Sequence, residues 1–141
     1  MADRRQMLDA LKAILIPVLK CDGFSGSFPH YRRRRPDLYD LVTFQFDRHG
    51  GGFVVEIARC LPSGIEHPTG HVQAGKARAW DRHPNHRKRI KPRHGAGTDT
   101  WFRYDGEEEP AEVARAALLA LSDPTIWDDV SPLGSDTPYG K

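Results

Sequence analysis

The chain has 141 residues, a net charge of +2 and 38% hydrophobic residues, which is typical of one globular domain and excludes a wholly disordered chain. No segment approaches the roughly 20 consecutive apolar residues that cross a bilayer, so we expect no membrane partner. The two cysteines, Cys21 and Cys60, are too few for a disulfide framework and predict a protein of the reducing cytoplasm.

A helix is predicted from Asp3, a residue type that commonly caps helix N-termini, to Gly23, a typical terminator. Its apolar residues recur every three or four positions and form one stripe: Met7, Leu8, Leu11, Ile14, Leu15, Val18 and Leu19. Pro17 lies inside this pattern. Because its ring crowds the preceding turn and removes a backbone hydrogen bond, we expect the helix to kink or stop near Ile16.

The clearest strand pattern is a β-hairpin from Leu38 to Cys60. Apolar and polar residues alternate up to Phe46 and again from Phe53, which predicts two strands with opposite faces of different character. The three glycines at 50–52 reach the positive φ angles that a tight turn requires. The alternation also brings polar Gln45 into the middle of an apolar strand.

Weaker patterns predict three more strands and a second helix. The strands cover Phe24 to Arg33, His86 to Lys91 and Thr100 to Tyr104. The Pro- and Gly-rich segment from Leu61 to Asp81 is predicted to be a surface loop. The second helix begins at Pro110 and stops at Ser122, with a buried face of Val113, Ala117, Leu118 and Leu121.

This order of elements predicts an α+β fold with a single domain over residues 1–130. Consecutive strands favour an antiparallel sheet of about four to five strands, with the N-terminal and C-terminal helices packed on one face. Residues 131–141 lack a periodic pattern and are predicted to form a flexible C-terminal tail.

Several motifs in a defined order carry a resemblance. They are the helix end at Gly23-Phe24, the pair Tyr31-Arg32, the strands Leu41–Gln45 and Phe53–Ile57, and the segments Arg87–Ile90 and Asp99–Phe102. Spanning residues 6 to about 127, they resemble the uncharacterised bacterial family called domain of unknown function 4304. The resemblance implies an α+β fold and brings no established activity, cofactor or catalytic residue.

Five residues of the predicted strands are candidates for one ligand or partner face: Tyr31, Arg32, Gln45, Arg89 and Trp101. If they converge, the buried amide and guanidinium groups must be paired, because an unpartnered buried polar group is costly. Such a network would hold the sheet in register. As a binding site, the same groups would recognise a carboxylate or another polar group through two parallel hydrogen bonds.

Charge is strongly segregated along the second half of the chain. Residues 76–94 contain eight Lys or Arg and one acid, whereas residues 105–129 contain eight acids and one base. The basic segment supplies six candidate nucleic-acid contacts: Arg82, Arg87, Lys88, Arg89, Lys91 and Arg93. The alternative is that the two oppositely charged segments lie against each other within the fold.

Four histidines have spacings that zinc sites use: His67, His71, His83 and His86. Pro68 and Gly70 exclude the helix that would align the first pair, so we predict no metal site. The sequence contains no nucleophile elbow, phosphate loop or dinucleotide motif, and we expect neither a catalytic residue nor a cofactor. The run Arg32–Arg35 is interpreted as a solubilising cluster at a sheet edge.

Together these features predict a small, cytoplasmic, non-catalytic binding protein with another protein as its partner. One concrete form is an immunity protein that neutralises a toxin, since small single-domain bacterial proteins with divided surface charge commonly serve in this way. The alternative is a nucleic-acid-binding accessory protein that uses residues 76–94.

Overall fold

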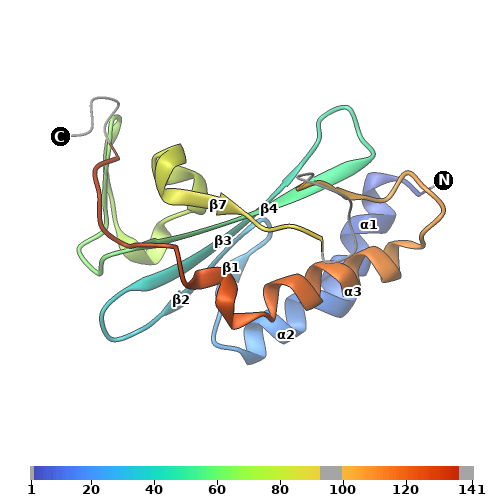
Figure 1. Cartoon of the computed structure of the whole chain (residues 1–141), viewed down its shortest axis with the longest axis horizontal. Coiled ribbons are helices and arrows are strands. Elements are labelled where there is room, and N and C mark those ends of the chain that lie inside the picture. The colour runs from blue at the N-terminus through green and yellow to red at the C-terminus, as the bar shows by residue number, and fades with distance from the viewer. Residues whose placement is uncertain (1, 93–99, 137–141) are drawn as a thin grey trace.

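The computed structural model describes residues 2–92 and 100–136. An antiparallel sheet forms the centre of the molecule, and the helices from the two ends of the chain pack together on one of its faces (Figure 1). This arrangement confirms the predicted α+β fold with both helices on one side. Within the described ranges, no helix has the length and apolar character that a membrane span requires.

The N-terminal helix consists of three consecutive helical segments. They are α1 (Arg4–Ala10), a π-helical turn (Leu11–Leu15) and α2 (Ile16–Cys21). Asp3 caps the first segment, as predicted. Its carboxylate accepts a hydrogen bond from the backbone N–H of Gln6, and the Gln6 side chain accepts one from the N–H of Asp3.

The helix passes Pro17 without ending. A stop near Ile16 is therefore wrong, because the π-helical turn immediately before the proline accommodates it. The backbone N–H of Ile16 donates to the carbonyl of Leu11, five residues earlier in the chain. This wider turn relieves the crowding between the proline ring and the preceding carbonyl groups.

Six strands form the main sheet. They are β1 (Ser25–Ser27), β2 (His30–Arg34), β3 (Tyr39–Phe46), β4 (Gly52–Cys60), β7 (Arg87–Arg89) and β8 (Phe102–Arg103). Their order is β1-β2-β3-β4-β7, with β8 also paired to β4, and all pairs are antiparallel. The hairpin β3–β4 is confirmed. The single strand predicted from Phe24 to Arg33 is instead a second hairpin, because residues 28–29 form the turn between β1 and β2.

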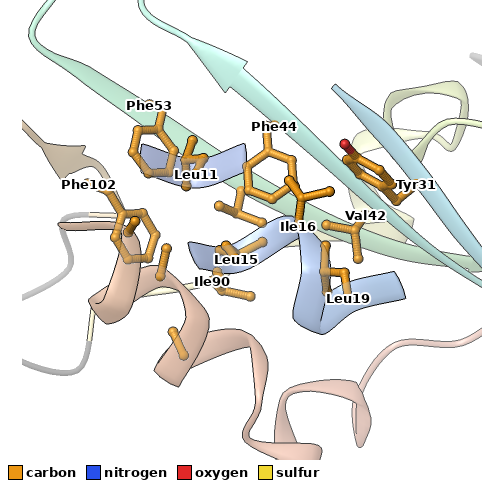
Figure 2. Close-up of a cluster of buried hydrophobic side chains, with 14 of the residues drawn as sticks. Leu11, Leu15, Ile16, Leu19, Tyr31, Val42, Phe44, Phe53, Ile90 and Phe102 are labelled. Carbon is orange, nitrogen blue, oxygen red and sulfur yellow. The ribbon is translucent and has the colours of Figure 1, made fainter. Parts of the chain in front are cut away.

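One face of the sheet and the helices enclose the main hydrophobic core. Figure 2 shows strand side chains (Tyr31, Val42, Phe44, Phe53 and Phe102) facing helix side chains (Leu11, Leu15, Ile16 and Leu19). α3 (Pro110–Leu121) completes the cover with small side chains: Val113, Ala114, Ala117 and Ala120. Phe44 and Phe53, from β3 and β4, are 1% and 0% exposed. Because side chains alternate along each strand of the hairpin, Phe44 and Phe53 both face the core.

The segment from Leu61 to Asp81 covers the second face of the sheet and is not only a surface loop. It contains the hairpin β5 (Ile65–His67) and β6 (Gly70–Val72), and 3-10 turns at Ala74–Lys76 and Ala79–Asp81; a further turn follows at Pro84–His86. Buried alanines from this segment pack against Leu41, Ala58 and Cys60 in a second, smaller core. Single turns have no periodic pattern, so the sequence carried no signal of this burial.

Residues 131–136, expected to belong to a flexible tail, are held against the fold. The side chain of Arg82 donates to the carbonyls of Pro132 and Leu133, both at 2.7 Å. Its Nε also lies 2.8 Å from the Asp136 carboxylate. A free tail therefore does not begin at residue 131, and residues 137–141 lie outside the described ranges.

Candidate binding groove

A groove of about 580 Å³ lies between the helices and one end of the sheet. The ends of α2 and α3 and a short 3-10 helix, η5 (Pro124–Trp127), line it together with residues of β2 and β4. Six large apolar side chains line it, beside the polar Ser122 and two acids, and we call these six its apolar walls: Val18, Leu19, Phe24, Leu118, Leu121 and Trp127. Its floor carries three guanidinium groups, from Arg33, Arg35 and Arg59. We call it the arginine groove.

The register of the sheet builds this floor around one carboxylate. Asp40 on β3 is paired with Arg33 on β2 and with Arg59 on β4, so the three side chains lie in a row across the strands. Asp40 is fully buried, and Arg33 Nη2 and Arg59 Nε each lie 2.8 Å from its oxygens. Arg35, just beyond the end of β2, places its Nε 2.6 Å from Asp40 Oδ2.

Asp40 stays ionised despite its burial. Burial alone raises the pKa of this carboxyl, but hydrogen bonds from the three arginines outweigh that effect and hold the pKa below its ordinary value. One carboxylate therefore faces three cations at the floor. Further acids line the rim of the groove, where exposed Asp22 binds Arg33 Nη1 at 2.8 Å and Asp128 is also exposed.

Two of the arginines are fixed by aromatic rings and by additional acceptors. The Arg59 guanidinium lies 5.2 Å from the centre of the Trp127 ring and donates to the Trp127 carbonyl. That of Arg33 lies 4.5 Å from the centre of the Phe24 ring. Guanidinium groups held in place beside apolar walls suit a ligand that combines a carboxylate with apolar surface.

The five residues expected to form one polar face do not converge. Tyr31 faces the main core and is 2% exposed, whereas Arg32, its neighbour on β2, faces the opposite side and donates to a backbone carbonyl there. Gln45 is exposed, so the expectation that it is buried is wrong. Arg89 and Trp101 do lie together, with the guanidinium 5.8 Å from the ring centre.

Several cations of the basic segment are paired with acids within the fold. Arg87 and Arg89 both approach Glu56, at 3.5 Å and 3.7 Å, because β7 pairs with β4. Lys88, on the other face of β7, lies 2.8 Å from Asp129, and this hydrogen bond holds the pKa of Asp129 below its ordinary value. The contact joins the basic segment to the acidic one, as the alternative interpretation of the charge pattern expected.

The other candidate nucleic-acid contacts differ in exposure. Arg82 is 2% exposed, and its guanidinium is engaged by the C-terminal segment, so it is not available to an external phosphate. Lys91 is exposed. Arg93 lies outside the described residues.

Histidines of the middle segment take part in local turns. His71 bonds to Glu66, and the ring of His83 accepts a hydrogen bond from the backbone N–H of Asn85. Over residues 2–92 and 100–136, no three His, Cys, Asp or Glu side chains are grouped so as to hold a metal ion.

Residues 15–127 match the family model described as Domain of unknown function (DUF4304). The chain belongs to this family. No curated protein and no solved structure matches the chain. The DUF4304 match includes Asp40, all three arginines of the groove and Trp127, and it ends before the segment that Arg82 holds.

In this DUF4304 chain, the arginine groove escaped prediction because Arg32–Arg35 is typical of a solubilising run. The spacing of the arginines along the strand was a signal from which part of the groove could have been predicted. Alternation places Arg33 and Arg35 on one side of the strand and their neighbours on the other. Asp40, an acid inside the next strand, requires a cationic partner once it is buried. Arg59 becomes a further candidate only when the register of the β3–β4 hairpin is known.

Proposed function

We propose that this protein is a non-catalytic binding protein and that its partner is another protein, held in the arginine groove. The observation that carries the proposal is the combination of a fixed cationic floor with apolar walls. Arg and Trp are the residue types that contribute most often to the binding energy of protein interfaces. Trp127 and Arg59 pack together in the lining of the groove, and half-exposed Val18 lines it too.

The partner is a protein rather than a nucleic acid for an electrostatic reason. A nucleic acid requires a stripe of cations that are free to replace its counterions. In the basic segment, Arg87, Lys88 and Arg89 already lie beside acids, and Arg82 is buried. The groove also carries acids at its rim, which would repel a run of phosphates but tolerate a single carboxylate.

The proposal includes a setting, the cytoplasm of a bacterium. Cys21 and Cys60 are both free thiols, which agrees with a reducing compartment. In its most specific form, the partner is a toxin domain with an acidic and apolar patch, and the protein is its immunity protein. A toxin gene beside the gene for this chain would support that form.

The test is a selection of displayed random peptides of about 12 residues against the purified protein. We expect enrichment of peptides that combine Asp or Glu with apolar residues. Val18→Glu places an acid on the groove wall and should abolish their binding. Leu119→Glu is the matched control, because Leu119 is equally half-exposed on a helix but does not line the groove.

Three outcomes would contradict the proposal: no enriched peptide, enriched peptides without acids, or equal binding by the Val18→Glu variant. A mixed-sequence single-stranded oligonucleotide provides the parallel comparison. Micromolar affinity near physiological salt, lost on changing Arg87 and Arg89, would favour the nucleic-acid alternative.

A further inference from the structure

Arg35 differs from the other arginines of the groove in how its donors are used. Arg33 is shared between Asp40 and Asp22, and Arg59 between Asp40 and backbone carbonyls. Arg35 donates to Asp40 through Nε alone. Among the described residues, its two Nη groups have no hydrogen-bond acceptor, and the side chain is 45% exposed, against 15% and 19% for Arg33 and Arg59.

We infer that Arg35 is the residue of the groove that binds a carboxylate of the partner, supplied by an Asp or Glu side chain in an otherwise apolar segment; the inference rests on the proposed function. The two Nη groups of a guanidinium form a planar fork that matches the two oxygens of a carboxylate. The bond from Nε to Asp40 Oδ2, at 2.6 Å, fixes the plane of this fork before a partner arrives. A preorganised donor loses less side-chain entropy on binding.

Charge balance in the groove favours a single carboxylate over a phosphate. The three arginines are offset by Asp40 beneath them and by Asp22 and Asp128 at the rim, so the groove is neutral as a whole and the positive charge open to a partner is that of the half-exposed Arg35. A dianionic phosphate would meet repulsion from both rim acids. Asp22, bound to Arg33 at 2.8 Å, is an internal example of a single carboxylate accepted by this cluster.

The walls indicate what should flank the carboxylate. Val18 on α2 is 43% exposed at one side of the groove, and Leu118 and Leu121 on α3 line it too. Covering these side chains with aliphatic groups removes apolar surface from water and adds affinity to the charged contact. A partner segment with an acid between two aliphatic residues can bind Arg35 with its carboxylate and cover the apolar walls with its aliphatic side chains.

Two tripeptide probes separate the charged contact from the apolar one. N-acetyl-Leu-Glu-Leu-amide and its Gln analogue are titrated into isotope-labelled protein, and the indole N–H of Trp127 reports occupancy of the groove by NMR. We expect saturable shifts with the Glu peptide and about tenfold weaker binding of the Gln peptide, the usual loss for one charge-assisted contact.

Arg35→Lys keeps the positive charge beside Asp40 but removes the fork. We expect it to weaken the Glu peptide about tenfold and to remove most of its advantage over the Gln peptide. Arg34→Lys is the matched control, since Arg34 is the exposed last residue of β2, directly before Arg35, and does not line the groove. It should leave both affinities unchanged.

The outcomes separate a failure of the inference about Arg35 from a failure of the proposal that the groove binds a protein. If neither peptide shifts Trp127, both fail. If both peptides bind equally to the wild type, or if Arg35→Lys retains the Glu preference, the groove is a binding site but Arg35 does not read a carboxylate. A phosphoserine peptide that binds more tightly than the Glu peptide would overturn the choice of a single carboxylate. The wild-type comparison decides the question even if Arg35→Lys is poorly folded.

Discussion

Thr43 and His30 show how a single buried contact can tie two parts of the chain together. The hydroxyl of Thr43 bonds the ring of His30 at 3.1 Å and accepts a hydrogen bond from the backbone N–H of Ala79 at 3.0 Å. It thereby fastens the 3-10 turn at residues 79–81 to the second face of the sheet. Burial, and secondarily the charges of Arg78 and Arg32, lower the pKa of His30 to about 4.

The lowered pKa of His30 predicts that the stability of the fold depends on pH. Unfolded histidine binds its proton near pH 6.5, whereas folded His30 binds it only near pH 4, so the unfolded state takes up protons first as the pH falls. The free energy of unfolding should therefore drop between pH 6.5 and 4, by about 1–3 kcal/mol because partial exposure reduces the full effect. Urea titrations of wild type and His30→Asn measure this. The variant should lose most of the slope, while His49→Asn, at an exposed turn, should keep it.

Thr43 and Gln45 lie two residues apart on one strand face but in different environments. Thr43→Val leaves the Ala79 N–H without its acceptor, and we expect it to cost about 1–3 kcal/mol of stability. Gln45→Ala changes an exposed side chain and should stay within about 0.5 kcal/mol. Denaturant titration compares them directly. A loss above about 1 kcal/mol for Gln45→Ala would restore the buried network that the sequence suggested.

At the scale of elements, the β3–β4 hairpin is the part on which most of the fold depends. All eight residues of β3 pair with Phe53–Cys60 of β4, and one face supplies the aromatic centre of the main core. The helices pack on this face, so their positions follow from it. The groove depends on it too, because Asp40 and Arg59 are cross-strand neighbours in the same hairpin.

Phe44→Ala tests this dependence. Phe44 is 1% exposed and contacts the rings of Phe28, Tyr31 and Phe53, so its truncation should cost roughly 3–5 kcal/mol and leave little folded protein. Leu119→Ala, on the exposed side of α3, is the control and should cost less than about 0.5 kcal/mol. Circular dichroism with denaturant titration measures both. If Phe44→Ala cost below about 1 kcal/mol, Phe44 would not be a core residue.

At the scale of the whole molecule, ion pairs connect regions that are far apart in the sequence. Lys88 meets Asp129, Arg82 meets Asp136, and Arg59 meets Asp40. Part of the positive charge of residues 76–94 is therefore neutralised by acids of the same chain, and Lys88 joins this segment directly to the acidic one. This pairing is the reason why we propose a partner other than a nucleic acid.

The contacts of Arg82 lead us to predict that this side chain holds the C-terminal segment against the fold. Arg82→Met removes the donors to the carbonyls of residues 132 and 133 and one of two partners of Asp136, which keeps its hydrogen bond from the backbone N–H of His83. We expect residues 131–135 to be loosened and cut rapidly by a nonspecific protease, with a stability loss of about 2–4 kcal/mol. Mass spectrometry of the digest locates the cuts. Arg87→Met, which loses contact with Glu56 alone, should not expose this segment, and unchanged cutting in Arg82→Met would contradict the retention.

The sequence by itself determined the elements whose signals lie within a few neighbouring residues. The Asp3 cap, the alternation of the β3–β4 hairpin, the proline at the start of α3 and the family match all belong here. Adjacent residues of a strand face opposite sides, so the separation of Tyr31 from Arg32 was also available from spacing alone. These features need no knowledge of which strands are neighbours.

Only the tertiary structure decided which distant residues meet. The row of Arg33, Asp40 and Arg59 depends on the register of three strands, and the hold of Arg82 on Leu133 joins positions 51 residues apart. The burial of Ala74, Ala77 and Ala79 likewise depends on an open sheet face that only the assembled fold provides. A buried charge must find a partner wherever the fold brings one close. The entropic cost of bringing two residues together grows only slowly with their separation in the sequence, so distant partners serve as well as near ones.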